Sequence, residues 1–454
     1  MKYDVVVVGA GSAGCMAAYT SAKKGFKVCL IDAKSKEKVG DKICGNALGF
    51  HHLDRIDLKI PNEVITNKIN GVIIYSPSLY FWDVPLGDYV GGMLDRVAFG
   101  QYLLDLAISA GAELKEKTIV DEAIVKEDFV KGVKTRFGEE IYAEIVIDAS
   151  GLKSLIRRKL PASLGIETVE EKDVNLAYRE IRKVRHELEK CEMYLDPDKF
   201  PGGYAWLFPQ SDDSVNVGLG VQKVEGFPDP KVRLYETVLK KDMFKGSEVL
   251  EVNGIKQAGR MDVPTRRPLA SLVRNGIIFA GEAGSVVNPI TGGGNGPAIV
   301  TGKFAGDTAC EALEEGDTSE GALWSYNLRH YTERDGFGLR YSRLDAFRFL
   351  LQSVTPKDLD YAMKRRIIKE DDLITLSTKG ELRLNIFDKT GRIIRGLGRP
   401  KLLDNLNYIK NVMEEIKTHC LNYPSSPYGF NEWKGRTDSI FSNLEKIFKP
   451  YAGK

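Results

Sequence analysis

A glycine-rich loop near the N-terminus constrains the fold more than any other feature of the sequence. Residues 9–14 read GAGSAG, which places the G-x-G-x-x-G spacing directly after an apolar strand and at the start of a helix. Gly9 permits a tight turn, Gly11 lets the backbone approach a pyrophosphate, and Gly14 lets the helix pack closely on the strand. Asp32 closes the next strand, where an acid can accept hydrogen bonds from ribose hydroxyls. The spacing therefore predicts a dinucleotide-binding βαβ unit.

The apolar periodicity around this loop is typical of a doubly wound α/β sheet. We expect a strand ending at Val8, a helix over about 12–24 that stops at Gly25, and a second strand over 27–31. Further elements are expected downstream, namely a helix over 95–110, a strand over 113–117, and a β-rich meander over 128–147 with turns at Gly132 and Gly138.

Charge and cysteine content exclude several classes of protein. The 65 Lys and Arg residues nearly balance the 63 Asp and Glu residues, so no field of one sign attracts nucleic acid. The six cysteines form no C-x-x-C pair and the five histidines lack metal-ligand spacing, so we expect no metal site and mostly buried cysteines. His51 and His52 are interpreted as a solvated helix end without a catalytic role. The immediate start of the first strand leaves no room for a signal peptide, and no apolar run reaches the ~18 residues that span a bilayer.

The second half of the chain has two different patterns. Between about 165 and 260, Val, Tyr and Phe alternate with polar residues, which predicts a half-exposed antiparallel sheet. A strand over 276–280 and a long helix from Pro297 then return to the first sheet, and the remaining residues are expected to be mainly helical. Within 401–423, apolar residues at helical spacing favour core packing over membrane docking.

Three later motifs favour FAD over NAD as the dinucleotide. Arg96 opens the second helix, residues 148–151 (DASG) close a strand, and residues 277–284 (IIFAGEAG) repeat the strand-to-acid ending. In this order the motifs resemble the para-hydroxybenzoate-hydroxylase-like FAD superfamily, in which the late acid holds the ribityl chain. Residues 289–297 (PITGGGNGP) then bring bare backbone to a helix start, whose positive end would favour the negative charge of a reduced flavin.

Two further motifs resemble the geranylgeranyl reductase family. Residues 40–47 (GDKICGNA) are similar to its GDKxCG loop, and residues 201–209 (PGGYAWLFP) to its PxxYxWxFP motif. Residues 264–268 (PTRRP) also fit, and the resemblance covers about 1–310 well and the C-terminal helices more loosely, through segments such as 421–424. Members of this family reduce isolated alkenes of geranylgeranyl chains on archaeal phospholipids, chlorophyll precursors or quinones.

The resemblance implies an FAD-bound reductase that faces the cytoplasm and contacts the inner face of the cell membrane peripherally. Its substrate would be a prenyl lipid, and its electron donor NAD(P)H or a ferredoxin, because the chain has no second G-x-G-x-x-G. Together with the glycine loop, the resemblance implies one set of cofactor-binding residues: Gly9, Gly11, Ala13, Gly14, Asp32, Cys44, Gly45, Ala47, Arg96, Val120, Gly281, Glu282, Gly293, Gly294 and Asn295.

The substrate is expected to lie against aromatic side chains. An unactivated alkene is a poor hydride acceptor, so it needs a dry apolar tunnel beside the flavin and a proton source on the opposite side. Tyr204, Trp206 and Phe208 alternate along one strand, so their side chains share a face that could wall this tunnel. By resemblance Cys44 lies at the flavin, and Cys44 and Tyr204 are the candidate catalytic residues.

The chain departs from the family pattern at the late acid. The family usually has Asp in a GD motif at this position, whereas this chain has Glu282. The surrounding loop must absorb one additional methylene group if the hydrogen bond to the ribityl chain is to form. A diverged relative with another lipid substrate would explain the difference.

These motifs predict three lobes in an α/β chain. The FAD-binding domain comprises 1–55, 94–160 and 261–315, the substrate-binding domain 56–93 and 161–260, and the helical C-terminal domain 316–454. A prenyl-quinone tail reductase and an FAD-dependent aromatic monooxygenase on the same fold remain alternatives, together with the less favoured flavin halogenase and a lipid carrier that keeps FAD only structurally.

Overall fold

The glycine loop joins the first strand and the first helix of a mostly parallel sheet. The computed structural model describes residues 2–87, 90–252, 254–382 and 398–451. β1 (Lys2–Val8) pairs in parallel with β2 (Val28–Ile31) and with β11 (Glu140–Asp148), and α1 (Ser12–Lys23) connects β1 to β2. The order of this first sheet is β20 (Val273–Arg274), β21 (Ile277–Phe279), β11, β1, β2 and β8 (Glu113–Lys115). β10 (Phe129–Thr135) also pairs with β11, and β9 (Val120–Lys126) pairs with β10.

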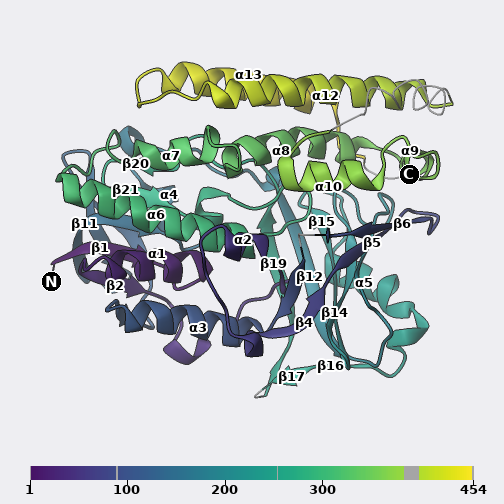
Figure 1. Cartoon of the computed structure of the whole chain (residues 1–454), viewed down its shortest axis with the longest axis horizontal. Coiled ribbons are helices and arrows are strands. Elements are labelled where there is room, and N and C mark those ends of the chain that lie inside the picture. The colour runs from purple at the N-terminus through teal and green to yellow at the C-terminus, as the bar shows by residue number, and fades with distance from the viewer. Residues whose placement is uncertain (1, 88–89, 253, 383–397, 452–454) are drawn as a thin grey trace.

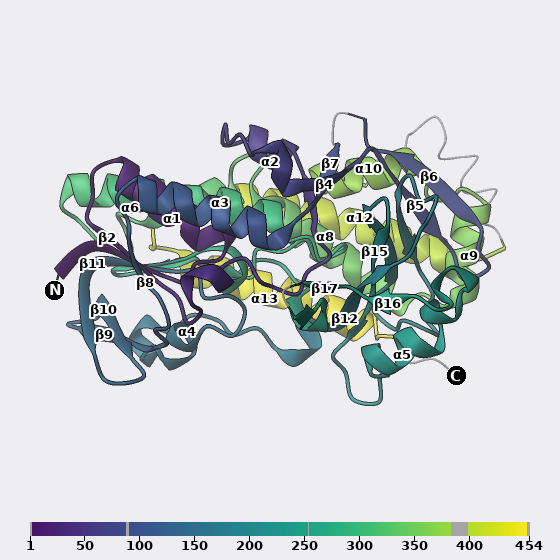
Figure 2. The same ribbon diagram turned by 90° about the horizontal axis from the view of Figure 1, so that it is seen from below.

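Helices and strands cover opposite faces of the first sheet. Viewed from below, α1, α3 (Arg96–Ser109) and α6 (Asn295–Glu315) lie on one face, and β9, β10 and α4 (Leu155–Lys159) on the other (Figure 2). Because side chains alternate along β1, Val5 and Val7 belong to the core beneath the helices and Val6 and Val8 to the core beneath β9 and β10. The near-continuous apolar run of β1 follows from burial on both faces.

A second sheet, also of eight strands and mostly antiparallel, lies beside the first (Figure 1). Its strand order is β16 (Glu248–Val249), β12 (Val174–Lys183), β15 (Ser214–Gln222), β14 (Ala205–Ser211), β13 (Cys191–Tyr194), β5 (Gly71–Tyr75) and β6 (Phe81–Pro85), and β19 (Ala258–Pro264) also pairs with β12. Smaller elements flank it: β3 (Ala47–Gly49), β7 (Gly91–Leu94) and β4 (Ile65–Ile69) form one sheet, β17 (Glu251–Val252) and β18 (Ile255–Lys256) another, and α2 (His51–Asp54) and α5 (Pro230–Glu236) are short helices.

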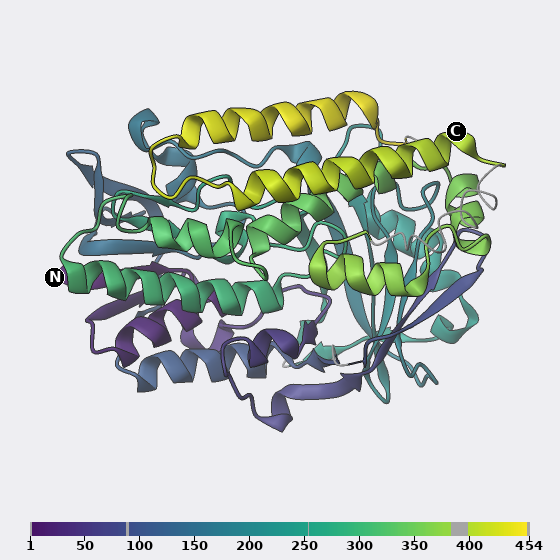
Figure 3. The ribbon, with the colours of Figure 1, turned by 45° about the horizontal axis from the view of Figure 1, so that its top comes forward.

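The C-terminal residues described by the structure are mainly helical, as predicted. The helices are α7 (Trp324–Tyr331), α8 (Phe337–Ser353), α9 (Pro356–Lys364), α10 (Glu370–Lys379), α12 (Pro400–Leu421) and α13 (Phe430–Ile447). Figure 3 shows α12 and α13 side by side across α7 and α8. The predicted core packing of 401–423 is confirmed, because its apolar residues Leu402, Leu406, Ile409, Met413 and Ile416 are buried. Within the described ranges, no helix has both the length and the apolarity that crossing a membrane requires.

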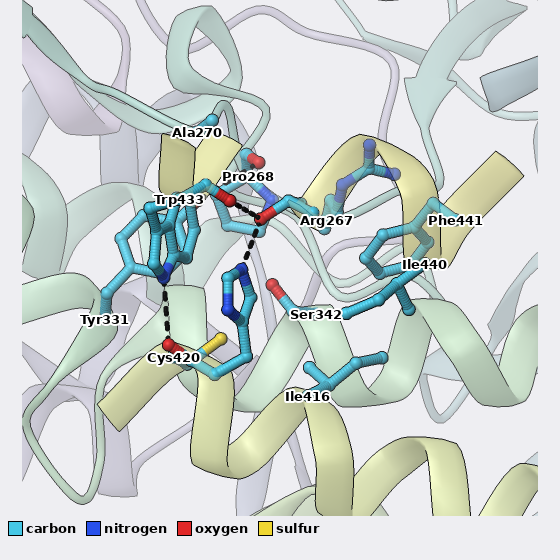
Figure 4. Close-up of a pocket in the computed structure, with 12 residues that line it drawn as sticks. Arg267, Pro268, Ala270, Tyr331, Ser342, Ile416, Cys420, Trp433, Ile440 and Phe441 are labelled. Atoms are coloured by element: carbon cyan, nitrogen blue, oxygen red, sulfur yellow. Dashed lines mark hydrogen bonds between the residues drawn. The ribbon is translucent and has the colours of Figure 1, made fainter. Parts of the chain in front are cut away.

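The α12–α13 pair closes over a small internal cavity. Trp433 Nε1 donates to the His419 carbonyl at 2.9 Å, and the His419 ring bonds Thr437 at 2.8 Å beside it (Figure 4). The cavity measures about 10 Å³, which is the lower limit for a single water molecule. This space is therefore a packing defect and is too small for a lipid.

Three sequence predictions need correction. Gly132 is not a turn: it lies inside β10 at a register shift, and its φ of +146° accommodates the resulting bulge. The antiparallel sheet is not half-exposed along β15, where every residue is buried because further elements cover both faces. His51 and His52 are not a solvated helix end, since both are half-buried and burial lowers their pKa values, that of His51 to about 4. The expectation of mostly buried cysteines is confirmed, because only Cys44 is partly exposed.

A buried network of charges connects the sheets to the C-terminal helices. Arg266 pairs with Glu167, and the neighbouring Arg267 approaches Asp345 of α8 at 3.2 Å. Arg348, one turn further along α8, bonds Asp345 at 2.8 Å and Asp173 at 3.2 Å. The nearby arginines keep the pKa of Asp345 below its usual value although burial raises it. Breaking one member of such a network typically costs about 3–5 kcal/mol.

The buried His330 predicts a pH dependence of stability. Its side chain is 1% exposed between Tyr326 and Phe337, neither ring nitrogen has a hydrogen-bond partner, and burial lowers its pKa to about 3. The unfolded chain takes up this proton near pH 6.5, so below that pH the unfolded state binds more protons and stability falls. We expect His330→Phe to lose less free energy of unfolding than the wild type between pH 7 and pH 5, by up to about 1.4 kcal/mol per pH unit.

Urea unfolding at the two pH values measures this difference. His186→Phe is the matched control, because the His186 ring is hydrogen-bonded to the Ser211 carbonyl at 2.7 Å and should not contribute in the same way. Equal losses for wild type and His330→Phe would contradict the assignment.

Candidate active site

The glycine loop has the geometry of a phosphate cradle. Gly9 has a φ of +99°, and a side chain there would meet the Ala149 carbonyl oxygen at 2.6 Å. A side chain at Gly14 would come within 1.7 Å of the Gly9 carbonyl oxygen, so this contact of helix and loop also requires glycine. Gly11 caps α1, and a side chain there would meet nothing within 4 Å. The N-terminus of α1 thus presents bare backbone to open space, where an anion can bind.

Two charged residues flank this cradle. Asp32 accepts hydrogen bonds from the backbone of Ala10 at 2.6 Å and of Lys34 at 2.7 Å, so the loop and the strand end hold each other in place. Arg96 is 8% exposed, and its Nε and Nη1 atoms have no hydrogen-bond partner among the described residues. A buried guanidinium without a carboxylate is costly, and a pyrophosphate would supply the missing charge. The residues therefore fit a dinucleotide.

Val120 lies toward the same end of the site. It begins β9, two residues after Thr118, whose backbone donates to the Asp32 carbonyl at 2.8 Å. Its side chain is 8% exposed and belongs to the core beneath β9 and β10. The hydrogen bond between Thr118 and Asp32 therefore places Val120 near the Asp32 end of the site.

The late acid is paired with a residue of the GDKICG motif that was not among the expected cofactor-binding residues. Gly281 has a φ of +61°, and a side chain there would lie 3.0 Å from the Ala13 methyl group, so this strand end lies directly against α1. Glu282 follows, and its Oε1 accepts from Lys42 Nζ at 2.6 Å. Lys42 belongs to the GDKICG loop, so the longer acid in place of the family's Asp is held by a lysine from that same loop.

The N-terminus of α6 meets the Cys44 loop. Asn295 Nδ2 lies 3.4 Å from Cys44 Sγ and donates to the Ala47 carbonyl at 3.1 Å. Gly294 caps α6 without a side chain, and Gly293 precedes it. A side chain at Gly45 would touch the Phe208 ring at 3.5 Å. The predicted residues 44, 45, 47 and 293–295 are thus brought together at one helix N-terminus.

The three aromatic residues share one face, as predicted. The ring centroids of Tyr204 and Trp206 are 5.9 Å apart, and those of Trp206 and Phe208 are 6.1 Å apart. Tyr204 donates its hydroxyl to the Thr291 carbonyl at 2.5 Å, and burial raises its pKa. Phe208 packs on a small core around Met93, whereas Tyr204 and Trp206 belong to none of the hydrophobic cores of the described residues.

Two residues missed by the sequence analysis anchor the Cys44 loop. Arg179 Nε and Asn216 Nδ2 each donate to the Cys44 carbonyl at 3.1 Å, and Asn216 also accepts from Trp206 Nε1 at 3.1 Å. Arg179 is 2% exposed, and no carboxylate of the described residues lies within 4 Å of it. Its Nη1 donates to the Gln257 carbonyl at 2.7 Å, so it places a buried positive charge beside the loop. The only signal in the sequence was Asn216, an amide in the largely apolar β15; β12 carries several other polar and charged residues, so Arg179 did not stand out.

One register row leads away from this point across the second sheet. Arg179 on β12 lies opposite Gly218, which lies opposite Trp206. The row continues through Met193 and Ile74 to Trp82 on β6. Directly opposed residues share a face, so these side chains form one apolar row, about 14 Å long from Trp206 to Trp82 at the usual strand spacing. We call the side chains of Trp206, Met193, Ile74 and Trp82 the apolar lane.

Comparison with protein families identifies relatives along the whole chain. Residues 173–256 match the profile of the geranylgeranyl reductase catalytic domain, and residues 4–58 match that of glucose inhibited division protein A. The digeranylgeranylglycerophospholipid reductase of Sulfolobus acidocaldarius is 37% identical over 98% of this chain and 99% of its own length. Digeranylgeranylglycerophospholipid reductase 2 of Methanopyrus kandleri is 33% identical over 75% of this chain and 85% of its own.

Solved structures share the fold at lower identity. A geranylgeranyl bacteriochlorophyll reductase-like protein from Thermoplasma acidophilum superimposes with a TM-score of 0.70 and 24% identity, covering 90% of this chain and 99% of that one. A flavin-dependent brominase matches with a TM-score of 0.66 and 18% identity over 88% of this chain and 99% of that one. The chain thus has the fold of flavin-dependent enzymes, as predicted.

The unpartnered guanidinium of Arg96 leads to a test of cofactor binding. We expect Arg96→Met to raise the melting temperature of the cofactor-free protein, because it replaces a buried unpaired charge with an apolar side chain of similar volume. The same change should weaken FAD binding roughly ten- to hundredfold, since a charge-assisted hydrogen bond is lost. Flavin fluorescence titration and thermal melts measure the two effects. Arg136→Met, at an exposed position, is the control, and an unchanged FAD affinity in Arg96→Met would exclude a pyrophosphate at Arg96.

Proposed function

Because the chain belongs to the digeranylgeranylglycerophospholipid reductase family, we propose that it saturates the double bonds of geranylgeranyl chains on a glycerophospholipid, in the synthesis of archaeal-type membrane lipids and with FAD as cofactor. Family membership rests on the 37% identity over nearly the whole chain. The relatives' names favour a phospholipid over a quinone or an aromatic compound as the substrate.

The observation that carries this proposal is the meeting of the Cys44 loop with the apolar lane. The loop lies between the N-terminus of α6 and the second sheet, through Asn295 on one side and Arg179 and Asn216 on the other. Bound FAD, when reduced, supplies a hydride from its N5 atom. The residues proposed to hold it run from the glycine loop and Arg96 to Glu282 and the 293–295 segment.

The lane supports a long apolar substrate. The inner half of the lane, Trp206 and Met193, lies outside every hydrophobic core of the described residues, although both are apolar and at least half-buried. The outer half, Ile74 and Trp82, packs in the main core. Side chains that fill a lobe core would belong to one of these cores. A prenyl chain lying along the lane would exclude water from the alkene next to Cys44, which hydride transfer to an isolated double bond requires.

Saturation of an alkene also requires one proton for each hydride. We assign this role to the Cys44 thiol, since Cys44 is the partly exposed cysteine and its Sγ lies near two N–H donors, Asn295 Nδ2 at 3.4 Å and Asn46 N at 3.3 Å. These donors and the nearby Arg179 would stabilise the sulfur once it has given up its proton. Tyr204 is the weaker candidate, because burial raises its pKa and its hydroxyl proton is committed to the Thr291 carbonyl.

The reductant, NAD(P)H or a ferredoxin, and the peripheral contact with the membrane stay part of the proposal. A lipid substrate requires access from a lipid phase, and a flavin that reduces it must be re-reduced after each double bond.

The reaction can be tested without the natural reductant. The protein is loaded with FAD, reduced anaerobically with dithionite and mixed with digeranylgeranylglycerophospholipid, while flavin absorbance and product mass are followed. We expect flavin reoxidation with a gain of two hydrogens per double bond. Flavin that stays reduced until air is admitted would exclude the proposed substrate.

Replacing the proposed proton donor should slow this reoxidation. Cys44→Ala is expected to lower its rate at least about 100-fold, the usual contribution of a general acid, while FAD affinity changes little. Cys310→Ala, at a buried cysteine of α6, is the control and should react at the wild-type rate. A normal rate in Cys44→Ala would remove Cys44 from the mechanism.

Blocking the lane should discriminate between chain lengths. Ile74→Trp places a large ring two strands from Trp206, so kcat/KM should fall about tenfold or more for a geranylgeranyl substrate and much less for a geranyl one. Ile73→Trp is the matched control, because the adjacent side chain points to the opposite face of the sheet. Equal effects of the two variants on both substrates would exclude the lane as the binding path.

A further inference from the structure

The turn between β5 and β6 exposes apolar side chains that the rest of the fold does not cover. Leu79 is 64% exposed, Tyr80 36% and Phe81 55%. The three residues are consecutive, so the exposed apolar area is continuous at one tip. A continuous apolar patch on a soluble surface usually marks a binding site.

The backbone at this tip is held in an unfavourable conformation. Leu79 has a φ of +62°, in the left-handed region where glycine is normally found. Its amide donates to the Ser76 carbonyl at 2.9 Å, and the Ser76 amide donates to the Tyr80 carbonyl at 2.8 Å, so the turn itself fixes this conformation. Glycine would make the same turn without strain. Strained positions cluster at functional sites, and here the strain directs an apolar side chain into solvent.

The tip is attached to a basic helix. Asp360 of α9 accepts hydrogen bonds from the Ser76 hydroxyl at 2.5 Å, the Ser78 hydroxyl at 2.7 Å and the Ser78 amide at 3.1 Å. Figures 1 and 2 both show α9 beside β5 and β6 at one end of the molecule. The turn and the helix therefore form one surface.

Positive charge surrounds the apolar tip. Residues 357–370 contain five Lys and Arg residues against three Asp and Glu residues, and Lys357, Lys364, Arg365 and Arg366 are exposed. Lys364 and Arg366 have carboxylate partners on their own segment, whereas Lys357 and Arg365 have none within 4 Å among the described residues. An apolar tip with unpaired basic residues beside it complements an anionic lipid surface.

The tip also connects to the interior of the second sheet. Phe81 begins β6, and the next residue, Trp82, is the outer end of the apolar lane. Docking at this tip would bring a bilayer next to the strand that holds the outer end of the lane. The Trp82 side chain itself is buried in the main hydrophobic core, on the opposite face of β6 from Phe81.

We propose that Leu79, Tyr80, Phe81, Lys357 and Arg365, together the docking face, bind the surface of a bilayer that carries anionic head groups and deliver the prenyl chain to the lane; this rests on the proposed function for the nature of the lipid. The β17–β18 hairpin is the rival surface, since Val252 and Ile255 are 45% and 47% exposed. Its neighbours Glu248 and Glu251 are exposed acids, which anionic head groups repel.

Binding to vesicles tests the docking face. The FAD-loaded protein is sedimented with vesicles of phosphatidylcholine alone, or with vesicles in which about one lipid in three is the anionic phosphatidylglycerol. We expect binding to the anionic vesicles, and about tenfold weaker binding for Leu79→Gly, the gain from burying one leucine side chain. The melting temperature of Leu79→Gly should equal or exceed that of the wild type, because glycine relieves the backbone strain.

Ile255→Gly is the matched control, because it removes a similarly exposed aliphatic residue from the rival hairpin. It should bind like the wild type. Weaker binding of Ile255→Gly with normal binding of Leu79→Gly would move the contact to β17–β18 and overturn the proposal, as would wild-type protein that does not bind anionic vesicles.

A charge-reversal pair tests the electrostatic part. The double variant K357E/R365E should bind anionic vesicles at least tenfold more weakly, with a reduced dependence on salt concentration, because each basic residue near an anionic membrane contributes roughly fivefold to binding. Lys256→Glu, at the exposed end of β18, is the control. Equal losses in both proteins would indicate a nonspecific charge effect and overturn the assignment of this face.

Activity separates this inference from the proposed function. With geranylgeranyl diphosphate in solution, Leu79→Gly should reoxidise reduced flavin at the wild-type rate, whereas with the phospholipid in vesicles it should be several-fold slower. If the wild-type protein is inactive on both substrates, the proposed reductase function is refuted. The vesicle-binding experiments alone would then decide whether the docking face binds a bilayer. Equal rates for both proteins on vesicles would refute the delivery of lipid through this face.

Discussion

The clamp on the Cys44 carbonyl is the constraint on which the site depends. A loop that follows the first βαβ unit must reach the second sheet, and the hydrogen bonds from Arg179 and Asn216 hold its backbone there. Asn46, two residues on, has a φ of +62° and bonds Gln210 through its side chain at 2.9 Å, so the loop is fixed on both sides of Gly45. With the carbonyl held in this way, the thiol of Cys44 lies at the N-terminus of α6, where the two sheets meet.

Buried positive charge is a recurrent feature of this interior, and it has two uses. Arg266 and Arg348 are compensated by carboxylates, and their network ties the segments before β12 and after β19 to α8. Among the residues that the structure describes, Arg96 and Arg179 have no carboxylate partner, and both lie where the cofactor is proposed to bind. A protein tolerates an uncompensated buried cation when a bound anion repays its desolvation, which is why these two residues carry more functional information than the network.

The two faces of the second sheet have different roles: one stabilises the lobe, and the other is proposed to guide the substrate. One face of β14 presents Trp206 to the row that runs through Met193 and Ile74. The alternate residues of β14, such as Leu207, face the core that also contains Val217. Strand alternation thus separates the side chains that stabilise the lobe from those proposed to guide the substrate. The same row ends beside the exposed turn after β5, so a single sheet would connect the flavin side to a lipid surface.

Much of the fold could be read from local patterns. The glycine spacing, the terminal acid at Asp32 and the proline and glycines before α6 are requirements of backbone geometry, and such requirements act over a few residues. Gly132 was misread because a positive-φ glycine suits a bulge as well as a turn, and only strand pairing distinguishes them. The His51–His52 pair was misread because burial depends on α6, whose contact with His52 at Gly296 is remote in sequence.

The sequence by itself therefore determined the dinucleotide unit, the resemblance to a family and the shared face of Tyr204, Trp206 and Phe208, since each depends on neighbours along the chain. Only the tertiary structure decided which residues surround Cys44, that Lys42 pairs with Glu282, and that Arg179 and Trp82 lie on one row. These relations join strands and loops separated by up to 251 residues, and the free energy that selects them comes from packing and charge compensation in the folded state.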